Sequence, residues 1–81
     1  MLQAQVVVSP NPFSDRLSVA LSTPSLRSPV FHLFDVMGRL VHTERLEYGM
    51  NEIETGGLPK GAYFWVVEAG GERVKTGKVM K

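Results

Sequence analysis

The sequence contains no cysteine, which excludes a disulfide framework, a thiolate metal site and a cysteine nucleophile. Long hydrophobic runs are also missing: the longest cover residues 6–8 and 62–67, whereas a helix needs about 20 apolar residues to cross a bilayer. Nine basic and eight acidic residues leave a net charge of only +1, too little for an overall field that binds nucleic acid or an anionic membrane. We therefore expect no nucleic-acid partner and no direct membrane insertion.

Patterns of catalytic and metal-binding residues are lacking as well. The two histidines, His32 and His42, have no neighbouring ligand at metal-binding spacing, and we interpret them as partly exposed strand residues. No serine stands in a Gly-x-Ser-x-Gly turn, and the glycine pair at residues 70–71 has no lysine of a phosphate-binding loop. The carboxylates fall in turns or at alternating strand positions, where capping or solvation explains them. The sequence therefore predicts a protein that is not an enzyme and binds no cofactor or metal.

The length of 81 residues and the apolar fraction of 43% fit one small globular domain over residues 1–81. Residues 1–4 are interpreted as a linker or a cloning remnant. The first five residues lack the basic and apolar regions of a secretory signal peptide, so any such signal is expected on a longer precursor.

Glycine and proline are abundant, and their spacing predicts an all-β fold. Eight glycines and five prolines recur between short β-branched or aromatic runs, as in β-sandwiches. We predict an immunoglobulin-like antiparallel β-sandwich of about seven strands in two sheets. Strands are expected over residues 5–9, 16–22, 30–36, 39–46, 52–55, 62–67 and 72–80.

Turn chemistry separates these strands. Asp35 and Gly38 fit the first and last positions of a type I turn, and residues 58–61 fit another with Pro59 at its second position. Residues 48–51 mark a further turn, and residues 70–71 suit a two-residue hairpin loop with positive φ. Strand alternation directs five side chains to the core: Leu17, Val19, Leu21, Phe31 and Leu33.

Two predictions concern the last two strands. The uncharged run at residues 62–67, with three aromatic side chains, is typical of a central strand buried on both faces. Val74 and Val79 are an odd number of residues apart, so a regular strand would place them on opposite faces. A bulge at Gly77 would bring both valines to the core.

Basic residues are concentrated at the carboxyl end of the sequence. Residues 72–81 hold four basic residues and one acidic residue, a local charge of +3 that leaves −2 for the rest. One interpretation is that these lysines protect an edge strand from aggregation. The other, given equal weight, is a basic strand that acts as a signal.

Four motifs follow one another along the chain: Pro10-Asn11-Pro12 with Asp15, an Asp-x-x-Gly-Arg turn at residues 35–39, a Gly-x-Asn at residues 49–51 followed by Leu-Pro-x-Gly-x-Tyr at residues 58–63, and a lysine-rich terminal strand at residues 78–81. Taken in order, they resemble the type A C-terminal sorting domain of the type IX secretion system of Bacteroidetes. The resemblance covers almost the whole chain, and the sequence departs from the family in having Ser9 where an aromatic residue is usual and Met80 in the terminal strand. The residues that carry it, and that we take as signal and recognition residues, are Pro10, Asn11, Pro12, Asp15, Asp35, Gly38, Arg39, Gly61, Tyr63, Lys78 and Lys81.

The resemblance implies a non-catalytic address label fused behind a cargo protein. Domains of this family are recognised by the outer-membrane secretion machinery, the cargo passes from the periplasm to the cell surface or beyond, and a sortase removes the domain. The partners implied are that machinery, the sortase and the fused N-terminal cargo. An open terminal strand also offers backbone groups for strand addition by a receptor, or for an edge-strand dimer.

An alternative class is a stalk or carbohydrate-binding accessory module of a surface enzyme, because immunoglobulin-like sandwiches serve many functions. Tyr63, Phe64 and Trp65 could form a platform for a sugar. Burial of these three aromatic side chains in a central strand argues against such a platform.

Overall fold

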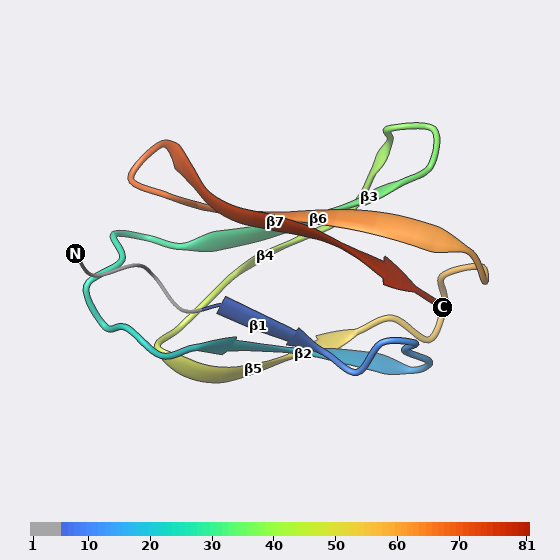
Figure 1. Ribbon diagram of the computed structural model, residues 1–81, viewed down its shortest axis with the longest axis horizontal. Helices are drawn as coiled ribbons and strands as arrows, with labels where there is room; N and C mark the ends of the chain where they lie inside the picture. The colour runs from blue at the N-terminus through green and yellow to red at the C-terminus, as the bar shows by residue number, and fades with distance from the viewer. Residues whose placement is uncertain (1–5) are drawn as a thin grey trace.

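The computed structural model describes residues 6–81 (Figure 1). Among these residues, no helix has the length and apolar character needed to cross a membrane. The predicted number of strands is confirmed, while Gln5, expected in the first strand, lies outside the described residues. The strands are β1 (Val6–Ser9), β2 (Arg16–Leu21), β3 (Val30–Asp35), β4 (Leu40–Arg45), β5 (Gly49–Glu54), β6 (Ala62–Ala69) and β7 (Glu72–Met80).

The strands form two antiparallel sheets that pack face to face, which confirms the predicted sandwich (Figure 1). One sheet has the order β1-β2-β5 and the other the order β4-β3-β6-β7. The register pairs apolar residues that point inward, such as Leu17 with Ile53 and Leu33 with Trp65. Inward-facing rows of both sheets thus meet in one core.

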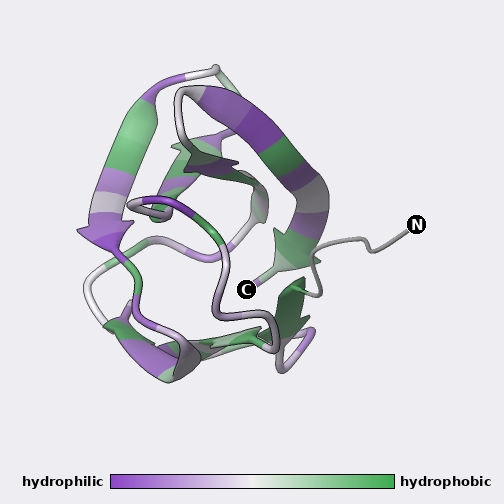
Figure 2. Ribbon diagram, turned by 90° about the vertical axis from the view of Figure 1, so that its left-hand side faces the viewer, coloured by the Kyte–Doolittle hydropathy of each residue, from purple (hydrophilic) through white to green (hydrophobic). Residues whose placement is uncertain are grey.

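The core follows from the alternation of hydrophobic and hydrophilic residues along the strands, visible as bands in Figure 2. Phe31 and Leu33 are fully buried, as predicted. The rings of Phe31 and Trp65 stack with their centroids 6.3 Å apart. The three residues predicted inward on β2 are also buried: Leu17, Val19 and Leu21.

Strand β6 is buried on one face only, so the prediction of two buried faces is wrong. Tyr63, Trp65 and Val67 point into the core, whereas Phe64 is 44% exposed. The four-stranded sheet has no layer on its outer side within residues 6–81, because its only sheet neighbour is the three-stranded one. An apolar strand therefore leaves an aromatic ring on the surface.

The predicted bulge exists, but at Val74 and not at Gly77. Val67 pairs with Lys75 and Glu68 pairs with Arg73, so Val74 is the extra residue on β7. It brings Val74 against the core that also holds Val79. Gly77 pairs regularly with Trp65, and a Cβ atom there would lie 2.6 Å from the indole ring, so this glycine makes room for the ring.

The turn predicted at residues 48–51 and the strand predicted at residues 52–55 are both displaced. Strand β5 already begins at Gly49, which pairs with Leu21. The Asn51 side chain accepts a hydrogen bond from Glu47 N at 2.9 Å and donates one to Glu47 O at 2.9 Å. The Asn51 amide thus holds a chain reversal that starts at Glu47, one residue before the turn predicted at residues 48–51.

Candidate functional site

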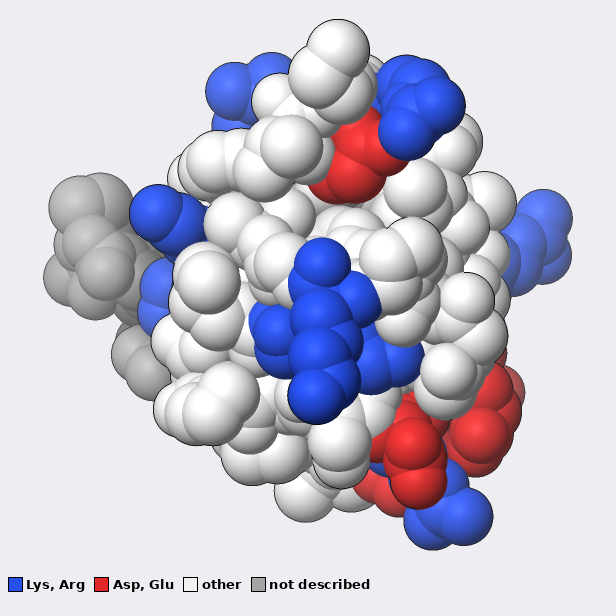
Figure 3. All heavy atoms as spheres, turned by 90° about the vertical axis from the view of Figure 1, so that its right-hand side faces the viewer, with Lys and Arg blue, Asp and Glu red and all other residues white. Residues whose placement is uncertain are grey.

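Apart from Lys78, the residues singled out by the sequence motifs gather at one end of the sandwich. Because all strands are antiparallel, the loops after β1, β3 and β5 and the end of β7 meet there, at the right-hand side of Figure 1. We call this end the motif end and define it as residues 10–15, 35–39 and 55–61 together with Lys81. In the space-filling view of this end, basic side chains gather near the centre and acidic ones at the lower right (Figure 3).

The Pro10-Asn11-Pro12 corner covers the end of β7. Asn11 Oδ1 accepts a hydrogen bond from Met80 N at 2.9 Å, and Phe13 N donates one to Met80 O at 2.8 Å. Both backbone groups of Met80 that point away from β6 are thereby satisfied. The corner also contributes to the core, because Phe13 is buried and meets the Tyr63 ring edge-on at 5.8 Å.

The corner is joined to the loop after β5 through Thr55, a residue that the sequence motifs did not indicate. Thr55 N donates to Asp15 O at 2.8 Å, and its hydroxyl donates to Ser14 O at 3.0 Å. Thr55 is the one polar residue among residues 6–81 that is buried. A lone threonine after a strand carries no distinctive pattern, so only the structure shows its role.

The hairpin between β3 and β4 confirms the turn predicted at Asp35. Gly38 N donates to Asp35 O at 3.0 Å, which closes a type I turn, and Gly38 has a φ of +81°. Asp35 Oδ1 accepts from Met37 N at 2.9 Å and from Arg39 N at 3.0 Å, while Oδ2 accepts from Arg39 Nε at 2.9 Å. Hydrogen bonding to the Arg39 backbone, chiefly, lowers the pKa of the Asp35 carboxyl.

The type I turn predicted at residues 58–61 is wrong. The turn hydrogen bond lies three residues earlier, from Leu58 N to Thr55 O at 3.1 Å. Gly61 instead pairs with Lys81, N to O at 3.1 Å and O to N at 2.8 Å, and has a φ of +150°. The Gly61 N–H, which would have closed a turn over residues 58–61, thus donates to Lys81 O instead.

Tyr63 fixes the loop before β6 from inside the fold. The tyrosine is buried, and its hydroxyl donates to Pro59 O, four residues upstream. Sandwich domains use a comparable tyrosine hydrogen bond to hold a corner between strands. Asp35, Arg39, Gly61 and Tyr63 line one shallow pocket, so the hairpin turn and this loop form a continuous surface.

The two lysines taken as recognition residues have different surroundings. Lys81 Nζ donates to Thr55 O and Leu58 O, each at 2.6 Å, and to Gly56 O at 3.3 Å. This lysine satisfies loop carbonyls and so has a structural role. Lys78 is exposed on the outer face of the sheet, where its Nζ lies 6.0 Å from the centre of the Phe64 ring.

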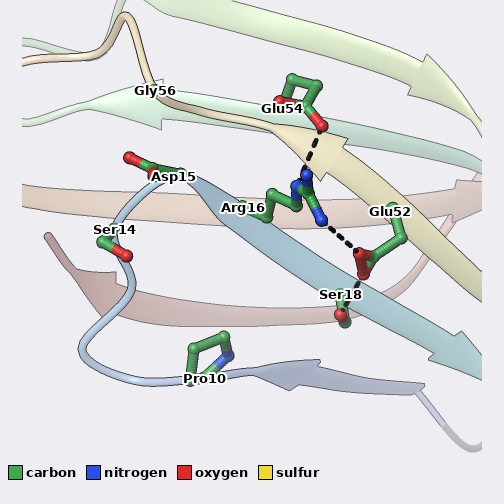
Figure 4. A pocket seen from close by; sticks show the side chains of 8 residues that line it. All are labelled: Pro10, Ser14, Asp15, Arg16, Ser18, Glu52, Glu54 and Gly56. Carbon is green, nitrogen blue, oxygen red and sulfur yellow. Dashed lines mark hydrogen bonds and ion pairs between the residues drawn. The ribbon is translucent and has the colours of Figure 1, made fainter.

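A shallow depression next to the corner contains Pro10, Asp15 and Arg16 (Figure 4). Arg16 Nε lies 3.2 Å from Glu54 Oε2, and the Ser18 hydroxyl donates to Glu52 Oε2 at 2.6 Å. Within residues 6–81, no group of three or more histidine, cysteine, aspartate or glutamate residues could hold a metal ion.

The aromatic platform of the carbohydrate-binding alternative is not formed. Tyr63 and Trp65 are 4% and 6% exposed, so of the three aromatic residues only Phe64 reaches the surface. A sugar-stacking surface needs exposed ring faces.

Comparison with protein families agrees with the sequence motifs. The profile of the family described as "Secretion system C-terminal sorting domain" matches residues 7–81. No curated protein matches the chain. The matched range includes every motif that forms the motif end, from the Pro10 corner to Lys81. The chain therefore belongs to the family of type IX secretion system C-terminal sorting domains.

Proposed function

We propose that this domain directs a fused upstream cargo protein from the periplasm across the outer membrane through the type IX secretion machinery, and that a sortase then removes it. The observation that carries the proposal is the family match over residues 7–81. The family is one of sorting signals and is in general non-catalytic, which supports a role as an address label. Residues 1–81 act together as one sorting unit in this proposal.

The motif end is the surface that we propose the machinery reads. Its loops are held by hydrogen bonds between distant segments, such as Asn11 with Met80 and Lys81 with Thr55. The surface therefore exists only in the folded domain, and it is the same whatever cargo precedes it. Arg39 is the most suitable contact residue, because its side chain is 76% exposed at the rim of the pocket between the hairpin and residues 59–63.

A fusion experiment tests this function. A fluorescent cargo placed ahead of residues 1–81 is produced in a host with a working type IX system, and cargo is measured in the periplasm and outside the cell. We expect the parent domain to export the cargo and Arg39→Ala to leave it in the periplasm.

The matched control is Arg45→Ala, which removes an exposed arginine from the opposite end of the same hairpin. Neither change should unfold the domain, since exposed ion pairs contribute about 1 kcal/mol or less. Retention of the parent fusion in the periplasm would contradict the sorting function. Equal export of the two arginine variants would contradict only the assignment of the motif end.

A further inference from the structure

Strand β7 has a short open edge, which we define as residues 75–78. Within residues 6–81, β7 pairs only with β6. Lys81 and Gly61 exchange two backbone hydrogen bonds, so the antiparallel alternation turns the backbone groups of Val79 and Gly77 toward β6 as well. The N–H and C=O groups of Thr76 and Lys78 point away from β6, and both residues are exposed.

Other parts of the fold limit the open edge at both of its ends. At one end, Asn11 and Phe13 occupy the outward N–H and C=O groups of Met80. At the other end, the bulge at Val74 interrupts the regular ladder. Proteins blunt exposed edges with coverings and bulges of this kind, and here the two devices leave a segment of defined length between them.

The open edge has a distinctive chemistry. Lys78 lies on its outer face, while Lys75 points inward and donates from Nζ to Val6 O at 3.0 Å. Between them, Gly77 offers no side chain, and the indole of Trp65 fills the space next to it. A strand added here would meet positive charge on both faces and an aromatic ring in the middle.

These charges disfavour a second copy of the chain and favour an acidic partner. Two copies joined edge to edge would bring Lys75 and Lys78 of one copy next to the same lysines of the other, which is unfavourable. On the outer face, carboxylates opposite Lys78 would be favourable, and the alternate residues of the added strand would then face inward toward Gly77 and the Trp65 ring.

We infer that the open edge binds an extended segment of a partner protein by strand addition, with acidic side chains at alternate positions and apolar side chains between them. Thr76 and Lys78 supply the backbone hydrogen bonds, and an apolar side chain of the segment covers the Trp65 rim at Gly77. That this partner is a component of the secretion machinery rests on the proposed function, whereas the binding chemistry does not.

A peptide titration tests the inference on the 81-residue chain. The probe is an eight-residue peptide of alternating valine and glutamate, with a valine and lysine peptide as control. Trp65 is the only tryptophan of the chain, so its fluorescence reports on this edge. We expect saturable binding of the acidic peptide and at least about tenfold weaker binding of the basic one. Equal binding of both peptides, or none, would overturn the inference.

Two methylated probes identify the mode of binding. A strand presents alternate N–H groups to each side, so N-methylation of the glutamates blocks one edge of the peptide and N-methylation of the valines blocks the other. We expect one methylated peptide to bind like the parent and the other to lose binding. The same affinity for both would exclude strand addition, whether or not any variant of the domain folds.

Variants of the chain locate the site. Thr76→Pro removes an outward N–H without removing a bond to β6 and should weaken binding of the acidic peptide about tenfold, whereas the control Thr76→Val should not. Lys78→Glu should reverse the preference toward the basic peptide. Unchanged affinity in Thr76→Pro or Lys78→Glu would place the peptide elsewhere and overturn the inference.

The same variants in the cargo fusion separate the two proposals. Export by the parent but not by Thr76→Pro supports both. Export by both domains contradicts the open edge as a machinery contact and leaves the sorting function intact. Failure of the parent fusion contradicts the sorting function, while the peptide titration still decides what the edge binds.

Discussion

Polar side chains in this domain act mainly on the backbone. Asp35, Asn11, Asn51 and Lys81 each bond to main-chain groups that no strand partner satisfies. Unpaired backbone groups in a small fold are costly, so one well-placed carboxylate, amide or ammonium group can hold a loop. The motifs of the sorting domain are, at this scale, sets of loop-holding residues.

The backbone conformations of Gly38 and Gly61 predict that alanine at either position destabilises the domain. Both have positive φ, +81° and +150°, which an alanine side chain would strain. Gly38→Ala and Gly61→Ala should each lower the free energy of unfolding by about 1 kcal/mol or more, measured by urea denaturation. Gly57→Ala is the control, since no atom lies within 4 Å of its added Cβ and its φ is not positive. Equal stability of all three variants would refute the turn geometry.

Asp35 predicts a pH dependence. Its pKa lies below the ordinary value of 3.8 in the folded protein, mainly because of the hydrogen bond from Arg39 N. A lowered pKa contributes stability that is present above the unfolded-state value and is lost as the pH falls through the folded-state value. Asp35→Asn should therefore be less stable than the parent at neutral pH, and this difference should shrink as the pH falls below 3.8. Chemical denaturation at several pH values measures it, and a constant difference would contradict the assignment.

Among the strands, β6 and β7 pack closely because the large Trp65 side chain on β6 lies opposite Gly77 on β7, which has no side chain. Trp65 lies against Gly77, and the bulge at Val74 lets β7 turn two valines toward the core. The packing of β6 against β7 thus depends on one glycine.

This fit predicts a coupled pair of substitutions. Gly77→Ala should cost about 1–3 kcal/mol, because the new methyl group would lie 2.6 Å from the indole ring. In a Trp65→Phe background, which lacks the outer indole atoms, the same change should cost less. Urea unfolding followed by circular dichroism gives the double-mutant cycle. Additive costs would show that the ring and the glycine do not constrain each other.

At the scale of the whole molecule, the motif end joins the two sheets. Met80 of the four-stranded sheet bonds to the corner that follows β1, and Lys81 bonds to the loop that follows β5 of the other sheet. Segments 69 residues apart in the sequence, Asn11 and Met80, meet directly. The surface proposed for recognition thus also holds the two sheets together at this end of the sandwich.

Lys81 and Lys78 give a prediction at this scale. Lys81→Met leaves three loop carbonyls without their ammonium partner and should destabilise the domain by about 1–3 kcal/mol. Lys78→Met, its matched control on the sheet surface, should change stability by about 0.5 kcal/mol or less. Thermal unfolding compares the two variants. A similar Tm for both would mean that Lys81 is a surface lysine like Lys78.

Features that depend only on neighbours along the chain could be predicted from the sequence. Alternation of apolar and polar residues identified the inward residues of β2 and β3. The aspartate and glycine at positions 35 and 38 identified the turn between β3 and β4. Strand alternation and turn formation both depend on local backbone geometry. The order of the motifs likewise indicated the family that the profile match shows.

Features that depend on which distant segments meet could not be predicted from the sequence and are seen only in the folded chain. Whether Phe64 is buried depends on whether a third layer covers the sheet. The position of the bulge at Val74 and the filling of the space at Gly77 by the Trp65 indole both depend on how β7 packs against β6. Gly61 pairs with Lys81 instead of closing its own turn, and Lys81 binds carbonyls 23–26 residues away. Hydrogen-bond partners and packing neighbours across such distances leave no periodicity in a sequence, so only the folded chain reveals them.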